Sequence, residues 1–432
     1  MDAVLIRVAV FCAWWYPQLQ SHQGGNGGGS NTIGIMVTAS HNDESYNGVK
    51  LVEANGEILA DPVIQEQLTD WVNNSENTTA SAGDGQNQHP IRQWLEQQST
   101  TTTTATAIGS SSASADAPTC VIHVGYDTRS HSLPLTELAI RTIRALGGQV
   151  LNHGVATTPL LHHVVFHHNP HRVPSMIPIH PDAVGYYHLL AWSYYALLRT
   201  APTTTTTTAT TTATSSPKRL VVDCACGVGY PSLQLFTKTL QSLLPATEPS
   251  PCPSSTFQCI NGPGDGPLNE NCGSEFVQKS NAIPKWYIPP TEGSNTMDGS
   301  LSSSSSSSTW DYCAAFDGDA DRIVFFSSSS GNNNNNKENN DFFLLDGDKI
   351  AVLLCDFMQK EVAALKEACR AQSSSATTST TTTTTSLRLG AVQTAYANGA
   401  STKYLKVKIR RDFFGPIMRC SSPLYYLFSL PS

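Results

Sequence analysis

Short apolar runs alternate along this chain with longer segments in which apolar residues recur every three or four positions. The short runs have the length and composition of buried strands, and they lie at residues 33–37, 120–124, 220–224, 312–316 and 323–326. The longer segments have a helical period, and they lie at residues 61–72, 133–146, 186–198, 231–243 and 349–358. Alternating strands and helices predict consecutive layered α/β domains with mixed sheets.

Low-complexity tracts interrupt this pattern. They are rich in Ser, Thr, Gly or Asn, and they lie at residues 20–30, 99–114, 203–216, 302–308, 331–340 and 373–386. Such tracts carry too little apolar surface to offset the entropy lost on ordering, so we expect each to be a disordered loop. The globular part is then considerably shorter than the whole chain of 432 residues.

The chain begins with MDAVLIRVAVFCAWWY, an apolar stretch that resembles a signal peptide. Asp2 and Arg7 interrupt the stretch and no small-residue cleavage site follows, so we favour a core helix. No segment of the sequence predicts a membrane span.

Composition narrows the class of protein further. Only 14% of the residues are charged and the formal net charge is -8, which disfavours a nucleic-acid partner. The eleven cysteines form no C-x-x-C pair. Their scattered spacing favours reduced thiols in a cytoplasmic protein over a disulfide framework.

One segment near the N-terminus presents reactive side chains on a turn. The strand-like run 33–37 stops at TASHN, so Ser40 lies where the backbone leaves the strand, with His41 beside it and Lys50 shortly after. A serine hydroxyl is a weak nucleophile until a base, a cation or a metal activates it, and this segment supplies the first two. The pattern predicts that Ser40 carries a covalently bound group.

A second segment, FDGDADRIV, supplies the metal site. Its residues Asp317, Asp319 and Asp321 alternate with small residues, so three carboxylates on one loop can converge on a small hard cation, most naturally Mg²⁺. The spacing also matches the start of an EF-hand, but Arg322 stands where that loop needs glycine, and a strand-like run follows. We therefore favour a magnesium loop over a calcium-binding EF-hand.

The motifs occur in the order found in the α-D-phosphohexomutases, and the chain resembles that family. In chain order, the motifs are TASHN, NGVK, YDTR, VDCACGVG and DGDADR, followed by VQTAYANGASTKYL. TASHN and the last of these segments are most similar to the phosphoacetylglucosamine mutase branch. The resemblance runs patchily from about Ile33 to Leu405.

The resemblance implies a division into domains. It places a phosphoserine-bearing α/β domain at residues 1–199 with a disordered insert near 99–116, and a linker at 200–217. A metal-binding domain at 218–340 and a partial third domain at 341–432 follow. A fourth domain, which binds the substrate phosphate in the family, has no counterpart in the printed sequence.

The resemblance also implies roles for the candidate residues. Phosphate would be carried on Ser40, and Mg²⁺ would be held by the three aspartates and an oxygen of that phosphoserine. Lys50 and Arg322 would lie near the transferring phosphoryl group. Arg322 suits this place because a planar guanidinium binds two phosphate oxygens at once. His41 would assist in proton transfer or phosphate contact, and Arg129 of YDTR would help to hold the substrate cleft.

The activity implied by this resemblance is the interconversion of N-acetylglucosamine 6-phosphate and 1-phosphate, a step toward UDP-N-acetylglucosamine. Two alternatives stay open: a mutase acting on glucose or mannose phosphates, and a catalytically silent magnesium-binding fragment. The sequence before Ile33 and after about Lys406 departs from the family pattern. We therefore expect the printed chain by itself not to isomerise the sugar phosphate at a useful rate, and the sequence gives no oligomeric state.

Three weaker patterns have plainer interpretations. Arg129 is as consistent with a loop ion pair as with a role in the cleft. The glycines of DCACGVG indicate a structural turn more than a phosphate cradle. Five histidines lie close together with spacing typical of metal ligands, but their helical context favours a structural role. They are His162, His163, His167, His168 and His171.

Overall fold

The computed structural model describes twelve stretches of the chain. They are residues 1–16, 32–59, 61–73, 120–169, 179–200, 220–243, 257–285, 312–328, 342–375, 391–394, 397–408 and 418–420. The described residues divide into two compact units, of which the first comprises 1–323 with 327–342 and the second 324–326 with 343–432. Five of the expected disordered tracts lie wholly outside the described residues, and the sixth, 373–386, does so except for the last three residues of a helix.

The first sheet is mixed and has the strand order β2-β1-β3-β4. Its strands are β1 (Thr32–Val37), β2 (Val49–Val52), β3 (Val121–Tyr126) and β4 (Gln149–Val155). β2 runs antiparallel to β1, whereas β3 runs parallel to both β1 and β4. The parallel pairing brings the carboxyl ends of β1 and β3 to one edge, where the TASHN and YDTR loops begin.

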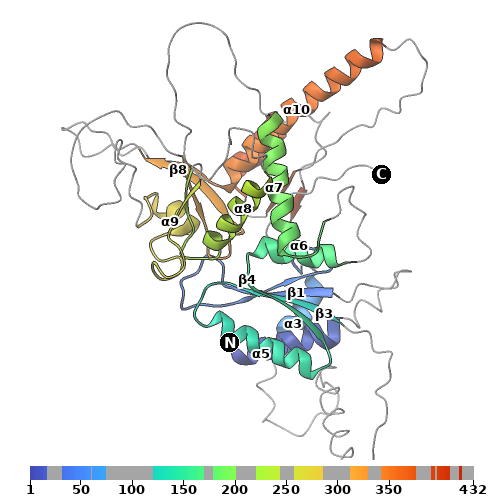
Figure 1. Cartoon of the computed structure of the whole chain (residues 1–432), viewed down its shortest axis with the longest axis vertical. Coiled ribbons are helices and arrows are strands. Elements are labelled where there is room, and N and C mark those ends of the chain that lie inside the picture. The colour runs from blue at the N-terminus through green and yellow to red at the C-terminus, as the bar shows by residue number, and fades with distance from the viewer. Residues whose placement is uncertain are drawn as a thin grey trace, which may run out of the picture. The chain divides into compact units, whose positions relative to one another are not determined.

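Helices cover both faces of this sheet (Figure 1). On one face lie α1 (Asp2–Val10), α3 (Pro62–Asn73) and α5 (Ser132–Ala145), which pack on the apolar side chains of alternate strand positions. On the other face α6 (Thr158–His168) covers Met36 of β1. Leu5, Val8 and Phe11 are buried in the first of these cores, so the expected N-terminal core helix is confirmed.

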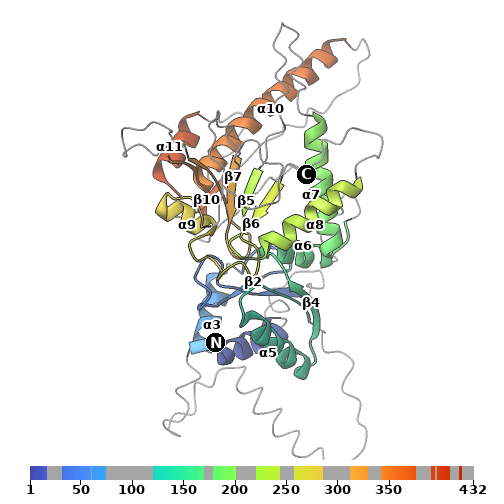
Figure 2. The same cartoon turned by 60° about the vertical axis from the view of Figure 1, so that its left-hand side comes forward.

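A second set of strands pairs in parallel within the same unit. β5 (Leu220–Asp223) lies between β6 (Phe257–Ile260) and β7 (Tyr312–Phe316). Helix α8 (Gly229–Leu243) contacts β6, and α9 (Gly273–Ser280) contacts β7 (Figure 2). Helix α7 (Ala183–Thr200) packs against α8. The DGDADR loop leaves the carboxyl end of β7, and β8 (Ile323–Ser328) begins directly after it.

The second unit contains the C-terminal elements. They are most of β9 (Phe342–Leu345), α10 (Gly347–Ser375), β10 (Val392–Thr394), α11 (Gly399–Lys408) and β11 (Met418–Cys420). Its small core consists of Cys355, Val362, Ala391 and Leu405. Helix α10 extends far beyond the expected 349–358, because the run EVAALKEACRA continues with strong helix formers.

The layered α/β class with a mixed sheet is confirmed, and each of the ten elements expected from periodicity is present. The division into three domains remains a prediction. Within the described ranges, no helix combines the length and hydropathy that a membrane crossing requires. The thiols of Cys12, Cys120, Cys224 and Cys226 are buried, and none of the four takes part in a disulfide bond.

A buried histidine in the first sheet gives a prediction about acid stability. His123 of β3 is fully buried, and its Nδ1 lies 2.9 Å from Nε2 of His153, with the ring of His168 also in contact. Burial, together with these two neighbouring rings, lowers the pKa of His123 to about 3. The unfolded chain therefore binds more protons than the folded chain between pH 6.5 and 3, so stability is full above this window and is lost as the pH falls through it.

Because of His123, we expect the free energy of unfolding to fall by about 2 kcal/mol as the pH is lowered from 7 to 5. Urea denaturation at several pH values measures this loss. His123→Leu should flatten the acid slope, whereas His188→Leu, which changes an exposed histidine, should leave it unchanged. An unaltered slope in His123→Leu would assign the acid sensitivity to other groups.

Candidate functional site

Ser40 lies three residues beyond the end of β1, and its hydroxyl points to the aspartate loop. Its Oγ donates a hydrogen bond of 2.7 Å to Oδ2 of Asp317, 277 positions further along the chain. Ser40 is 7% exposed and has a φ of 53°, in the left-handed region. A serine in this region costs free energy, so the surrounding structure must hold it there.

Asp127 is the centre of the network that holds this turn. Thr38 Oγ1 accepts the N–H of Ser40 at 2.9 Å and donates to Asp127 Oδ2 at 2.7 Å. Ser132 Oγ donates to the other oxygen of Asp127 at 2.6 Å. Sequence reasoning missed Asp127 as a functional residue, although its place in YDTR was the available signal.

Arg129 acts on the same turn through its whole guanidinium group. Its Nε donates to Asp127 Oδ2 at 2.9 Å, and its two terminal nitrogens donate to four backbone carbonyls of the Ser40 turn. The residue is 2% exposed. Because all five N–H donors are in use, the geometry favours a role for Arg129 in holding the turn, and direct binding of the substrate by Arg129 stays a prediction of the family resemblance.

The DGDADR loop brings its carboxylates together beside this turn. Oxygens of Asp317, Asp319 and Asp321 all lie within 4.8 Å of one another. Asp317 Oδ1 accepts the backbone N–H groups of Asp321 and Arg322, each at 3.2 Å, which curls the loop around the carboxylates. A Cβ on Gly318 would lie 2.7 Å from the carbonyl oxygen of Ser40, so the close approach of the two loops requires glycine there.

Lys50 is the cation that balances these charges in the structure. Its Nζ lies 2.5 Å from Asp319 Oδ2 and 2.7 Å from Asp321 Oδ2. Burial tends to raise the pKa of Asp319, but Lys50 and hydrogen bonds from Lys50, Thr158 and Ser40 hold that pKa below its usual value. For Asp317, burial and the two neighbouring carboxylates raise the pKa well above its usual value.

The donor set fits a divalent cation. Oδ1 of Asp319 and Oδ1 of Asp321 are buried and accept no hydrogen bond from the described residues. A buried acceptor without a partner is costly, and oxygen ligands are those that Mg²⁺ and Ca²⁺ prefer. Among the described residues, this is the one group of three or more His, Cys, Asp or Glu side chains with donor atoms this close.

Removing the Lys50 ammonium should destabilise the fold when no divalent cation is present. Lys50→Met leaves the buried Asp319 without its charge partner, so we expect the free energy of unfolding to fall by about 3 kcal/mol in EDTA. Mg²⁺ should recover more stability in this variant than in the wild type. Urea denaturation with EDTA and with Mg²⁺ measures both effects.

Lys279→Met is the matched control for Lys50→Met, because Lys279 is 74% exposed. We expect it to change stability little in either buffer. An equal loss in the two variants would contradict a special role for Lys50.

His41 and Arg322 lie at the solvent side of the two loops. Arg322 is 41% exposed, and its Nε lies 3.7 Å from Asp317 Oδ2 while its Nη1 lies 3.5 Å from Glu275 Oε2. Burial, followed by the positive charge of Arg322, lowers the pKa of His41. A neutral imidazole and a partly exposed guanidinium thus stand next to the serine and the aspartates.

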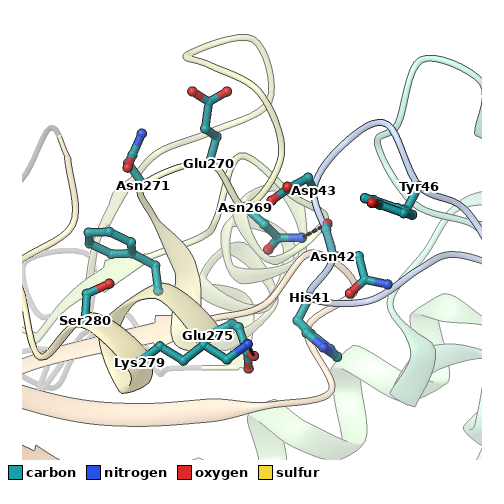
Figure 3. Close-up of a pocket in the computed structure, with 11 residues that line it drawn as sticks. His41, Asn42, Asp43, Tyr46, Asn269, Glu270, Asn271, Glu275, Lys279 and Ser280 are labelled. Carbon is teal, nitrogen blue, oxygen red and sulfur yellow. Dashed lines mark hydrogen bonds and ion pairs between the residues drawn. The ribbon is translucent and has the colours of Figure 1, made fainter.

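A cavity of about 530 Å³ opens beside His41 (Figure 3). The turn after Ser40 forms one side of the cavity, and α9 with the turn before it forms the other. Its lining residues are His41, Asn42, Asp43, Tyr46, Asn269, Glu270, Asn271, Glu275, Phe276, Lys279 and Ser280. The cavity gives a polar ligand access to the neighbourhood of the Ser40 turn.

Two further residues were missed from sequence. Asn269 Nδ2 donates to the carbonyls of Ser40 and Asn42, at 2.8 and 2.9 Å. Thr158 Oγ1 donates to Asp319 Oδ2 at 2.6 Å. They lie in the segments LNENCGS and ATTPLL, and no local pattern links either residue to the loop that it contacts.

The DCACGVG segment forms a structural turn, as its glycines indicate. Asp223 accepts N–H groups of Ala225 and Gly273 and the side-chain amide of Asn261. A Cβ on Gly227 would lie 2.4 Å from the carbonyl oxygen of Gly318. The turn therefore packs directly against the backbone of the aspartate loop at Gly318.

The α6 histidines contribute to packing in the described structure. His162 Nδ1 lies 2.7 Å from the carbonyl oxygen of Gly56, and the ring of His163 packs on Tyr186. His171 lies outside the described residues.

Comparison with known families supports this arrangement. The model named Phosphoglucomutase/phosphomannomutase, alpha/beta/alpha domain I, matches residues 29–79 and 87–182. The model named Phosphoacetylglucosamine mutase AMG1, domain III, matches residues 346–414. The expected departure from the family pattern after about Lys406 is therefore wrong, since the match extends to residue 414. The residues after Lys406 contain no recognisable motif, so this part of the match was not visible from motifs.

Curated relatives and solved structures agree with these models. The phosphoacetylglucosamine mutase of Sus scrofa is 32% identical over 406 residues, covering 94% of this chain and 56% of the relative. The enzyme of the same name from Saccharomyces cerevisiae is 30% identical over 382 residues, covering 87% and 55%. The chain thus spans about half the length of the curated relatives it matches.

A crystal structure of Aspergillus fumigatus N-acetylphosphoglucosamine mutase, in complex with GlcNAc-6P and magnesium, superimposes with a TM-score of 0.60 at 25% identity. The match covers 97% of this chain and 59% of that chain. An apo-form structure of N-acetylglucosamine-phosphate mutase gives a TM-score of 0.62 at 24% identity, covering 98% and 70%, and this match supports the fold alone. Together with the motif order and the two family models, these matches show that the chain belongs to the α-D-phosphohexomutase superfamily and groups there with the phosphoacetylglucosamine mutases.

Proposed function

We propose that this chain carries the phosphoserine and cation sites of a phosphoacetylglucosamine mutase, which interconverts N-acetylglucosamine 6-phosphate and N-acetylglucosamine 1-phosphate in the cytoplasm. The observation that carries the proposal is the 2.7 Å hydrogen bond from Ser40 Oγ to Asp317. It joins the two motifs that a phosphoserine carrier and its cation need, from positions 277 residues apart. The family membership of the chain supplies the sugar.

In the proposed reaction, Ser40 carries a phosphoryl group between the two positions of the sugar. The bond between phosphorus and Ser40 Oγ breaks as the 1-hydroxyl of N-acetylglucosamine 6-phosphate bonds to phosphorus, and the proton of that hydroxyl passes through His41 to the freed Oγ of Ser40. The resulting bisphosphate turns over and returns its 6-phosphoryl group to Ser40, while the proton goes back to the freed 6-hydroxyl. Net bonding in the enzyme is unchanged after each cycle.

The site residues would divide the work of this transfer. His41 is held neutral by burial and by Arg322, so it can accept the proton of the sugar hydroxyl. Arg322 can bind two phosphoryl oxygens, and Lys50 keeps Asp319 and Asp321 in place. Asp317, Asp319 and Asp321, with an oxygen on Ser40, would hold Mg²⁺, which supplies positive charge to the transferring group.

The test is phosphoryl exchange followed by ³¹P NMR. The protein is given Mg²⁺, a hexose 1,6-bisphosphate primer and one of three acceptors: N-acetylglucosamine, glucose or mannose 6-phosphate. We expect phosphate on Ser40 and transfer to the N-acetylglucosamine compound faster than to the other two. Faster transfer to glucose or mannose phosphate would assign the chain to another mutase, and no phosphate uptake would indicate a silent magnesium-binding protein.

A further inference from the structure

Thr158 connects the first sheet to the aspartate loop. It is the first residue of α6, directly after the helix N-cap Thr157, and it is 2% exposed. Its Oγ1 donates to Asp319 Oδ2 at 2.6 Å, and its backbone N–H donates to the Asp319 carbonyl oxygen at 3.1 Å. Two hydrogen bonds to one residue fix both the backbone and the side chain of Asp319.

The two oxygens of Asp319 have different surroundings. Oδ2 accepts from both Thr158 Oγ1 and Lys50 Nζ, at 2.6 and 2.5 Å. Oδ1 is buried and accepts no hydrogen bond from the described residues. Rotation of the carboxylate by half a turn would exchange the oxygens, but any intermediate angle would break the bond to Thr158. The hydroxyl therefore restricts the rotation of the carboxylate.

Charge supports the same assignment of the two oxygens. Asp319 is fully buried, so an acceptor left without a donor or a cation would cost free energy. The start of an α-helix also favours negative charge close to it, and the eleven-residue α6 begins at Thr158.

We propose that Thr158 is a positioning residue for the metal site, which reserves Oδ1 of Asp319 for the cation by occupying Oδ2. This inference rests on the proposed function only in taking the three aspartates as the cation site. Residues that hydrogen-bond to a metal ligand orient that ligand, and their loss typically weakens metal binding 10- to 100-fold. Lys50 holds Oδ2 by charge, whereas Thr158 supplies the direction.

The experiment measures Mg²⁺ affinity by isothermal titration in Thr158→Val and Thr158→Ser. Valine keeps the shape but removes the hydroxyl, so we expect binding about tenfold weaker. Serine keeps the hydroxyl, so we expect affinity within about threefold of the wild type. The same comparison is made through the rise in melting temperature on adding Mg²⁺, taken from each variant's own metal-free value, so a less stable variant is still informative.

Thr157→Val is the matched control. Its Oγ1 accepts the N–H of Leu160 at 3.0 Å and caps α6, so this variant should melt earlier without changing Mg²⁺ affinity. Wild-type affinity in Thr158→Val, or equal weakening in Thr157→Val, would overturn the positioning role. Absence of Mg²⁺ binding by the wild type itself would instead contradict the proposed cation site, so the two failures are distinguishable.

Discussion

Replacing Ser40 with alanine is expected to abolish phosphoryl uptake from a hexose 1,6-bisphosphate. The substitution removes the one oxygen that can form the phosphate ester, and alanine has no atom that can replace it. The hydroxyl's bond to Asp317 and its interaction with Asp319 are lost from the folded structure, and the rest of the turn is held by other residues, so the variant should remain folded. The measurement is incorporation of labelled phosphate, mapped to a residue by mass spectrometry.

Ser45→Ala provides the control, because Ser45 is an exposed serine on the same turn and takes part in neither loop network. It should take up phosphate at the wild-type rate. Phosphate mapped to any serine other than Ser40 would show that the carrier has been misassigned. An unphosphorylated but well-folded wild type would leave the serine chemistry without support.

Local patterns were sufficient for the ten elements predicted from periodicity and for the two loops that carry Ser40 and the aspartates, but not for strands such as β2, β4 and β6. The run 33–37 ends where the strand does, and DGDADR follows β7 directly, so Ser40 and the aspartates could be located from apolar periodicity and turn residues alone. Their contact could not, because nothing in either segment encodes a pairing over 277 positions. Motif order in the family was the only signal for that contact.

Residues that act through another residue were the ones missed. Asp127, Asn269 and Thr158 each hold a backbone group or a carboxylate oxygen of a loop distant in sequence. A single Asp, Asn or Thr after a strand has many ordinary roles in turns and caps, so its partner becomes visible only when the fold brings the loops together. Arg129 shows the converse, since its motif was recognised but its full set of acceptors came from the fold.

The length of α10 illustrates a limit of periodicity. Apolar spacing predicted residues 349–358, yet the helix continues to Ser375 through a segment rich in Ala, Glu and Lys. Helix propensity, rather than an apolar stripe, carries that extension. Apolar periodicity reports only the buried part of a helix, so it ends before the helix does.

Asp319→Asn is expected to weaken Mg²⁺ binding by about 100-fold, a larger loss than the roughly tenfold expected for Thr158→Val. The amide keeps one neutral oxygen but removes a full charge from a buried group of three carboxylates, and Mg²⁺ prefers charged oxygen ligands. Thermal denaturation measures the consequence. At a Mg²⁺ concentration 100 times the wild-type Kd, stabilisation should fall from about 2.7 to about 0.4 kcal/mol.

Asp70→Asn is the control for this measurement, because Asp70 is an exposed aspartate of α3 and makes the same chemical change away from the loop. Its Mg²⁺ affinity should equal that of the wild type. The metal-free stability of Asp319→Asn should fall less than that of Lys50→Met, since losing the Lys50 pair is partly offset by weaker repulsion from Asp317 and Asp321. If Asp317→Asn, Asp319→Asn and Asp321→Asn all bound Mg²⁺ as tightly as the wild type, the DGDADR loop could not be the cation site.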